Sequence, residues 1–252
     1  MPPVITLPVE PMARKVPILS KRAKGPVTPN FSKVSHMLEG STKAAFAFDK
    51  EKVRDQHGGI GMKMSFVSDI LENIENLDKH EKKAFYEGMT LFINQEVFFG
   101  LIFNLDVFVF ELYSILDYLA VELSEIFGLK VKKRDSLKDV ETFIELKDAE
   151  GLDASLKQMV NALIRQPWFD YFHRLRNRVT HRMPVNLLAH VKYENGKIVK
   201  FEYPFLPDNP DKITSTFDLQ LSLVSEPKKW IEGVFGFVDN VCEALISLLN
   251  VS

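Results

Sequence analysis

The sequence has a single cysteine, Cys242, in a chain of 252 residues. One thiol cannot form a disulfide within the chain, and its place in an apolar helical pattern favours a small core residue over a reactive nucleophile. The chain has no HExxH motif and no cysteine pair, and His173 and His181 are too far apart along the chain to suggest a zinc site. A glycine-rich phosphate loop and a serine nucleophile motif are also missing. We therefore expect no metal and no cofactor.

The sequence also lacks an excess of charge of one sign, with 32 basic residues, 34 acidic residues and a net charge of -2. This balance argues against a protein that coats nucleic acid, so any such contact has to be confined to a patch. No apolar run reaches the roughly 20 residues needed to cross a bilayer, because Asn104 and Asp106 interrupt the most apolar stretch, 97–110. The N-terminus has no signal-peptide core. The sequence predicts a soluble, cytoplasmic protein.

The first half of the chain divides into a proline-rich arm and a helical part. Residues 1–30 combine many prolines with basic residues, and we expect a disordered arm there. The remaining residues, 31–252, are expected to form one domain, because a hydrophobic content of 46% can supply a large core. The pattern up to residue 62 is ambiguous, with a helix around 41–54 and a turn at Gly58-Gly59.

Helical spacing becomes clear from residue 66 onward. Asp78 is followed three residues later by Glu81, which resembles a capping box and predicts a new helix starting near residue 79. Because no proline follows before Phe127, this segment is predicted to be one very long helix, or two joined near Gly100. Its middle is apolar on nearly every side, which indicates a central, buried helix.

The second half predicts shorter helices and one hairpin. Helices are expected over 136–146, after an N-cap at Asp153, from Pro167 to about Pro184, and from Ser225 onward. Residues 187–203 contain two alternating runs around Asn195-Gly196, a strong signal for a β-hairpin. The predicted fold class is all-α, with one inserted β-hairpin.

Arg176, Asn177 and His181 lie in the last two turns of the helix that begins at Pro167. A guanidinium offers planar, permanently charged donors to phosphate oxygens, and an imidazole titrates near neutral pH. At about 100° per residue, Asn177 and His181 share a face, whereas Arg176 lies roughly 140° from His181, beside the apolar edge. A straight helix cannot turn both side chains to one spot. Either the last turn distorts, or Arg176 reaches along the helix, or a second subunit completes the site.

Arg176, the polar Asn177, three further residues and His181 together resemble the arginine–polar–histidine signature of the HEPN superfamily. The position of the motif near the end of a late helix is similar too, and the resemblance covers about 64–250. It implies a HEPN-like bundle with long central helices that forms a homodimer, with both copies of the motif facing one cleft. It also implies a metal-independent endoribonuclease in a toxin, RNA-maturation or antiviral setting, with an antitoxin or regulatory protein as a further partner. The hairpin and the N-terminal arm are not part of the minimal HEPN bundle.

The resemblance also implies a role for each motif residue. His181 would act as general base or acid on a ribose 2′-hydroxyl that attacks its own phosphodiester, and Arg176 would stabilise the developing charge. Asn177 would hold the imidazole or contact a phosphate oxygen. The cations expected to bind the RNA backbone are Arg174, Arg178 and Arg182.

Two other interpretations stay open beside the ribonuclease. One is a HEPN-like module that binds RNA, a nucleotide or a protein without cutting, and the other is a helical scaffold whose basic helix end is simply solvated. The partner of Arg176 distinguishes these interpretations, because an arginine packed beside an apolar edge needs a partner. If that partner is Asp117 or Glu122, the two side chains form a structural ion pair. Glu111 and Asp117 are the acidic candidates to support the site. The histidines expected at the surface or in loops are His36, His57, His80 and His190.

Overall fold

The computed structural model describes residues 28–40, 48–81, 85–87, 90–92, 95–129, 142–180, 184–185, 187–195, 197–207, 209–211 and 221–250. In these segments the protein is mostly helical, as the sequence predicts. The α-helices are α1 (Pro29–Gly40), α2 (Lys50–Glu81), α3 (Gln95–Phe127), α4 (Thr142–Glu145), α5 (Ala154–Ile164), α6 (Pro167–Thr180) and α7 (Ser225–Asn250). The strands are β1 (Phe85–Glu87), β2 (Thr90–Phe92), β3 (Leu188–Glu194), β4 (Lys197–Leu206) and β5 (Leu221–Ser222).

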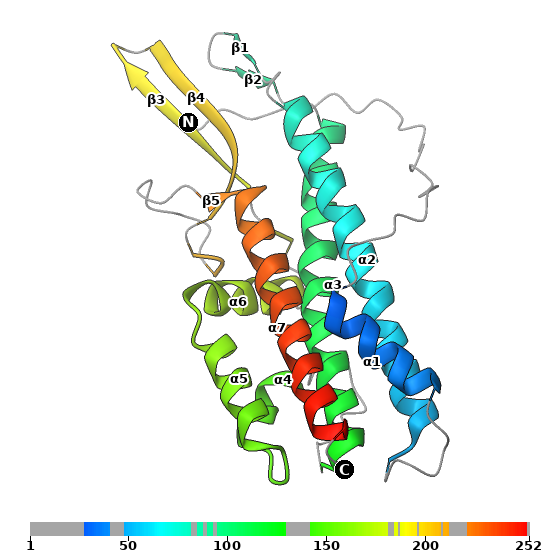
Figure 1. Ribbon diagram of the computed structural model, residues 1–252. Helices are drawn as coiled ribbons and strands as arrows, with labels where there is room; N and C mark the ends of the chain where they lie inside the picture. Colours follow the sequence, from blue (N-terminus) through cyan, green and yellow to red (C-terminus); the bar gives the residue numbers. More distant parts are fainter. Residues whose placement is uncertain are drawn as a thin grey trace.

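The two longest helices, α2 and α3, run antiparallel along the length of the molecule (Figure 1). Each presents a buried stripe whose members alternate between four and three residues apart, which is the spacing of a coiled-coil seam. The stripe of α2 consists of Val53, His57, Ile60, Met64, Val67, Leu71 and Ile74, and that of α3 of Leu101, Leu105, Phe108, Leu112, Ile115, Leu119 and Glu122. The pair of helices therefore forms the frame of the fold.

Each seam contains one polar residue, and these two residues bind each other. His57 Nδ1 lies 3.0 Å from Glu122 Oε1, and His57 Nε2 lies 3.0 Å from the carbonyl oxygen of Phe31 in α1. The Phe31 ring also stacks on the imidazole, with centroids 3.8 Å apart. His57 was expected at the surface, and that prediction is wrong: the residue is buried at the junction of α1, α2 and α3.

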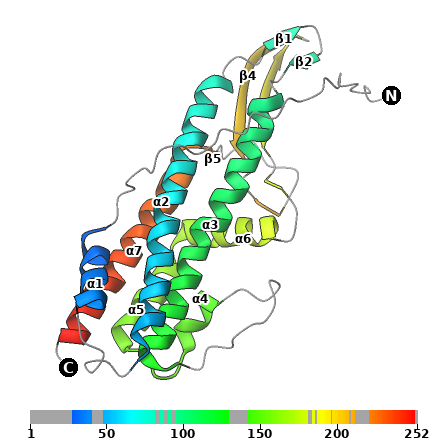
Figure 2. The ribbon, with the colours of Figure 1, turned by 90° about the vertical axis from the view of Figure 1, so that its right-hand side faces the viewer.

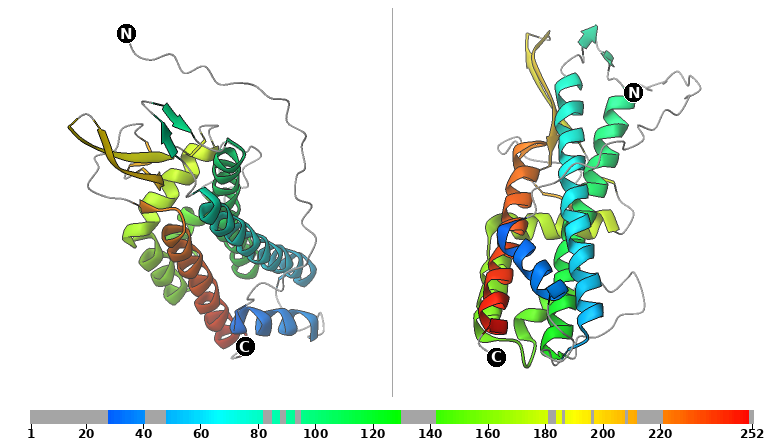
Figure 3. Two further views of the ribbon diagram at one scale, coloured as in Figure 1. Left: turned by 90° about the horizontal axis from the view of Figure 1, so that it is seen from above. Right: turned by 45° about the vertical axis from the view of Figure 1, so that its right-hand side comes forward.

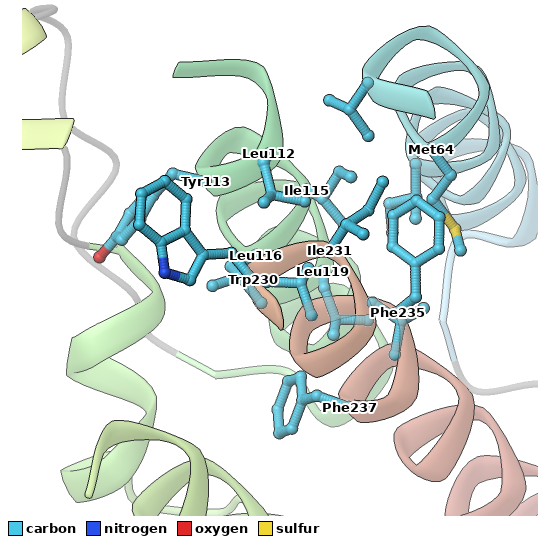
Figure 4. Packing of buried hydrophobic residues seen from close by; sticks show 14 of the residues in the cluster. Met64, Leu112, Tyr113, Ile115, Leu116, Leu119, Trp230, Ile231, Phe235 and Phe237 are labelled. Atoms are coloured by element: carbon cyan, nitrogen blue, oxygen red, sulfur yellow. The ribbon is translucent and has the colours of Figure 1, made fainter. Parts of the chain in front are cut away.

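The remaining helices pack around this frame. Helix α7 lies along α3, α1 lies against α2 and α7, and α6 lies across α3 (Figures 1 and 2). Figure 4 shows the resulting core, in which side chains of three helices meet, among them Met64, Leu112, Ile115, Leu119, Trp230 and Ile231. Helical spacing predicts one apolar face on the last helix, made of Trp230, Val234, Val238, Val241, Leu245 and Leu248. The first five are fully buried, whereas Leu248, near the end of the helix, is 37% exposed. Cys242 lies in the same core, where burial raises the pKa of its thiol.

The predicted hairpin is confirmed with slightly different bounds. Strands β3 and β4 pair antiparallel from Leu188 to Leu206, and Asn195 in the turn has a positive φ of 52°, as a two-residue turn of this type requires. The short β5 adds a third strand to β4. The hairpin projects beyond the helices at one end of the molecule (Figure 3).

One predicted boundary in the first half of the chain is wrong. No helix starts near residue 79, because α2 continues through Asp78 to Glu81 and the chain then forms the small β1–β2 hairpin before α3 begins at Gln95. Phe85 and Tyr86 in β1 and Thr90 and Phe92 in β2 are residue types that favour strands. Of the two alternatives, one helix or two joined near Gly100, the break is not observed, because α3 continues through Gly100.

Gly58-Gly59 lies inside α2 and does not form a turn. A Cβ atom on Gly59 would lie 2.7 Å from Cε1 of Tyr118 in α3, so this glycine permits close approach of the two helices. A helix was predicted around 41–54. Residues 41–47 lie outside the described residues, and residues from Lys50 onward belong to α2.

The N-terminal arm, predicted over 1–30, mostly lies outside the described residues, which begin at residue 28. Its last residues belong to α1. Asn30 donates from its backbone nitrogen and from Nδ2 to the two carboxylate oxygens of Asp239 in α7, at 2.9 and 3.0 Å. The start of the described chain is thereby fixed to the final helix.

Among the described helices, α3 is long and apolar enough to cross a membrane by length and composition. The apolar stretch taken from the sequence was shorter, because it ended at residue 110. Helices α2, α6 and α7 pack against α3, and its carboxylates at Glu111, Asp117 and Glu122 face cationic or histidine side chains of α2 and α6. These contacts are those of a helix that packs in a protein core, and a soluble, cytoplasmic protein stays a prediction.

Substitution of Gly233 by alanine is expected to destabilise the protein by about 1–3 kcal/mol. A Cβ atom at this position of α7 would lie 2.2 Å from Cζ2 of Trp168 in α6, so the Trp168 ring or the helix that carries it would have to shift. Gly236, one turn later in α7, has no atom within 4 Å of such a Cβ. Gly236→Ala should therefore stabilise by about 0.5–1 kcal/mol through helix propensity. Urea unfolding measures both, and an equal effect of the two substitutions would contradict the close α6–α7 contact.

The stability of the protein is expected to fall as the pH rises above about 6.5, the ordinary pKa of histidine. Burial alone would lower the pKa of His57, but the hydrogen bond and charge of Glu122 and the Phe31 carbonyl outweigh it, so the pKa is raised. A raised pKa gives stability that is fully present below the unfolded pKa and is lost as the pH passes the folded pKa.

Urea unfolding at a series of pH values tests this expectation. The decline should be smaller in His57→Gln, because glutamine does not titrate. His36 is largely exposed on α1, so His36→Gln should keep the decline of the unchanged protein. A decline of equal size in the His57 variant would show that another group causes it.

Candidate functional site

Helix α6 carries the sequence motif and is held by its apolar face. Pro167 occupies its first position, as predicted, and suits a helix start because its missing N–H would have no partner there. Phe169, Phe172 and Leu175 are buried, and the rings of Phe169 and Phe172 contact Tyr113 of α3. This packing fixes α6 across α3, so that the residues of its last turns lie against the middle of the long helix.

Arg176 is buried, with 6% of its surface exposed. Its Nη2 lies 3.7 Å from Oδ2 of Asp117, its guanidinium carbon lies 4.7 Å from the centroid of the Tyr113 ring, and Nη1 donates to Asn177 Oδ1 at 3.0 Å. The position beside the apolar edge is therefore confirmed. Of the two carboxylates named from the sequence, Asp117 faces Arg176, whereas Glu122 pairs with His57. The buried pair of Arg176 and Asp117 is the structural ion pair expected of a helical scaffold, and it counts against a catalytic role for Arg176.

The surroundings of Arg176 balance its charge without satisfying its donors. A separation of 3.7 Å between Nη2 and Asp117 is an ion pair but is too long for a hydrogen bond. The Nε atom is buried and has no hydrogen-bond partner among the described residues. Buried polar groups in folded proteins are nearly always hydrogen-bonded. The Nε–H of Arg176 can therefore donate a hydrogen bond to an acceptor that is not among the described residues.

Asn177 connects Arg176 to a second side chain of α6. Its Oδ1 accepts from Arg176, and its Nδ2 lies 3.2 Å from Nε2 of His173, one helical turn earlier. The His173 ring stacks on Tyr113, with centroids 5.6 Å apart. Asp117, Arg176, Asn177 and His173 thus form a continuous chain of polar contacts, and the Tyr113 ring contacts Arg176 and His173.

His181 and Arg182, the other residues of the predicted site in this turn, lie outside the described residues. The chain is anchored on both sides of them. Thr180, at the end of α6, donates its hydroxyl to the carbonyl oxygen of Arg176 at 2.9 Å. Val185 donates its backbone N–H to Oδ1 of Asp106 in α3 at 2.9 Å. Burial raises the pKa of Asp106, although this hydrogen bond acts in the opposite direction.

The two described arginines that were predicted to bind RNA are engaged by the chain itself. Arg174 donates through Nε to Asp211 at 2.8 Å and through Nη2 to Asn209 at 2.7 Å. Arg178 donates through Nη1 to the carbonyl oxygen of Pro210. Arg174 and Arg178, four residues apart on α6, both reach the segment that follows β4. The structure thereby places an internal carboxylate where an RNA phosphate was expected on Arg174.

Three features of this region are not predicted from the sequence. His173 has no predicted role, although His173 and Asn177 are four residues apart, a spacing at which side chains meet on a helix. The anchor at Asp106 and the segment 209–211 leave no local signal, because both contacts join distant parts of the chain. Glu111, named as an acidic candidate, pairs with Lys63 of α2 and does not reach Arg176.

Substitution of Asp117 by alanine is expected to destabilise the protein by about 3–5 kcal/mol, because it leaves the buried charge of Arg176 without a counter-ion. Asp211→Ala is the matched control. It removes the ion pair between Asp211 and Arg174 of α6, whose side chains are 55% and 38% exposed. Exposed pairs contribute at most about 1 kcal/mol. Urea unfolding of both variants gives the comparison, and similar small losses would show that Arg176 does not depend on Asp117.

Comparisons of the chain with protein-family models, with curated proteins and with solved structures find no match. The HEPN resemblance therefore rests on the motif of Arg176, Asn177 and His181 and on its helical context. The helical character of the chain agrees with that resemblance at the level of fold class.

Proposed function

We propose that the protein is a HEPN-like endoribonuclease that cuts RNA without a metal ion. The observation that carries the proposal is Arg176, a buried arginine whose Nε lacks a hydrogen-bond partner among the described residues and whose charge is held by Asp117 at 3.7 Å. A guanidinium in such surroundings favours a phosphate oxygen, because a charged acceptor supplies strong hydrogen bonds to open donors. The motif places His181 five residues further along the chain.

The chemistry of the proposal needs only these side chains and the RNA. His181 serves as general base for the 2′-hydroxyl or as general acid for the leaving oxygen. The 2′-oxygen bonds to the adjacent phosphorus, the bond to the 5′-oxygen breaks, and that oxygen takes up a proton. The products are a 2′,3′-cyclic phosphate and a 5′-hydroxyl. Arg176 stabilises the negative charge that grows on the phosphorane oxygens.

A second copy of the chain belongs to this proposal. Phe99 and Phe103 of α3 are 54% and 68% exposed, and Phe110 is 39% exposed. By helical spacing these rings lie on the face of α3 that also carries Asp106 and Asp117, so they extend the surface next to the motif. Exposed aromatic side chains gathered on one helix face indicate an interaction surface. A homodimer formed there would bring two motifs together. Arg176 of one chain and His181 of the other could then act on the same phosphodiester.

A second candidate function is a HEPN-like module that binds RNA, a nucleotide or a protein without cutting. The burial of Arg176 against Asp117 favours it, because a buried guanidinium has to be uncovered before it can contact a substrate. An antitoxin or regulatory protein remains a proposed partner under either function.

The full chain, incubated with a structured RNA pool in EDTA, is expected to cleave RNA and leave 2′,3′-cyclic phosphate ends. His181→Ala should slow cleavage by about 10²–10⁴-fold, the usual contribution of a positioned acid or base. His36→Ala, which changes an exposed histidine of α1, should cleave like the unchanged protein. Sedimentation of the unchanged protein should give a dimer.

Each other outcome of this experiment is informative. Equal cleavage by His181→Ala and the unchanged protein would refute the catalytic assignment and would indicate a contaminating nuclease. Retention of RNA without cleavage, at equal strength in both proteins, would establish the binding module. A monomer in sedimentation with full activity would remove the second copy from the mechanism.

A further inference from the structure

Arg176 fixes the orientation of the Asn177 side chain. A guanidinium carries only N–H donors, so the Asn177 atom that lies 3.0 Å from Arg176 Nη1 has to be the carbonyl oxygen. An amide that turned its nitrogen toward Arg176 would set two donors against each other. The orientation of this amide therefore follows from chemistry and does not depend on distinguishing nitrogen from oxygen by shape.

The orientation of Asn177 in turn fixes the tautomer of His173. With Oδ1 turned to Arg176, the NH₂ group faces His173 Nε2 at 3.2 Å. This group can only donate, so Nε2 has to offer its lone pair. The ring proton then resides on Nδ1. The contacts thus assign one particular neutral form of the imidazole.

The ring plane of His173 is fixed as well. It stacks on Tyr113, with an interplanar angle of 27°, and on Phe169, with an angle of 11° and a centroid distance of 6.2 Å. Tyr113 also lies under the guanidinium of Arg176. Because one aromatic ring supports both His173 and Arg176, neither the imidazole nor the guanidinium can tilt without disturbing a shared contact.

From this arrangement we infer that His173 is a positioning residue: its Nε2 lone pair holds the Asn177 amide, and the amide holds the guanidinium of Arg176. Among the described residues, Asn177 Oδ1 is the hydrogen-bond acceptor that Arg176 uses. Loss of the lone pair at position 173 frees the amide to rotate, and Arg176 then loses its orientation. The consequence for RNA cleavage rests on the proposed function, whereas the hydrogen-bond chain itself does not.

Two substitutions separate the lone pair of His173 from its ring. His173→Phe keeps an aromatic ring to stack on Tyr113 and Phe169 but has no acceptor. His173→Gln loses the ring but places an amide oxygen as far from Cβ as Nε2 is in histidine, so it can still accept from Asn177. A role in packing predicts that phenylalanine is the better replacement, and a positioning role predicts that glutamine is.

Nitrogen NMR of the full chain supplies a measurement that does not need activity. In the unchanged protein, Nδ1 of His173 should be the protonated ring nitrogen and Nε2 the unprotonated one. The guanidinium signals of Arg176 should show restricted rotation, which His173→Gln keeps and His173→Phe loses. The opposite tautomer, or Arg176 signals that are unchanged in the phenylalanine variant, would overturn the inference.

Cleavage assays then test the consequence for function. His173→Phe should cut RNA about tenfold more slowly, since loss of one orienting hydrogen bond changes a barrier by roughly that factor, and His173→Gln should stay within about twofold. If the unchanged protein does not cut RNA, the proposed function fails while the NMR result still decides the role of His173. If it cuts and the phenylalanine variant cuts equally fast, His173 does not position the site.

Discussion

The arrangement of the protein depends on how the carboxylates of one buried helix find partners. Helix α3 is apolar over most of its surface, and a buried charge without a partner is costly. Each carboxylate in the middle and at the end of α3 therefore contacts a different residue outside this helix. Asp106 accepts from the backbone of Val185, Asp117 faces Arg176, and Glu122 binds His57. Glu111 and Glu125 pair with lysines of α2. Apolar packing alone tolerates small shifts of one helix along another, whereas these contacts define one register for α2 and one position for α6.

The candidate site follows from the same constraint. Helix α6 crosses α3 at the point where Asp117 can balance a cation, and Tyr113 provides a ring for the guanidinium and for His173. The site is therefore built on rigid helices, with its polar groups connected to each other. A connected polar cluster of this kind holds its members in one geometry, and it also makes each member dependent on the next. The burial of Arg176 is the cost of that precision, because any substrate has to reach a group that the fold already covers.

The sequence predicted those parts of the fold whose signals are local. Asp153 caps α5 by accepting from Ser155 and Leu156, and the Asn195-Gly196 turn forms the expected hairpin. Helical periodicity correctly placed Arg176 beside the buried edge of α6. Asp78 and Glu81 misled, since a capping signal inside a helix has no effect when tertiary packing continues the helix. Gly59 misled in the same way, because its role is to admit Tyr118 and not to bend the chain.

Other parts could not be predicted because they depend on the relative position of distant segments. The choice between Asp117 and Glu122 as the neighbour of Arg176 requires the crossing point of α6 on α3. The contacts of Arg174 with residues 209 and 211 require the path of the chain after β4. The burial of His57, but not its partner, could have been predicted from the sequence, because His57 falls on the apolar spacing of α2. A polar residue at a seam position indicates a buried partner, which here is Glu122.

The hydrogen bonds between Asn30 and Asp239 have a consequence for the order of assembly. The two residues are 209 positions apart in the chain, so during synthesis on the ribosome α1 emerges long before the helix that receives it. Until α7 is made, the apolar residues Phe31, Val34 and Leu38 of α1 lack part of the surface that covers them in the finished protein. Contacts of such large sequence separation slow folding and leave apolar surface open to chaperones in the meantime. Closure of α1 onto α7 is thus a step that nascent chains can complete only after α7 itself has been translated.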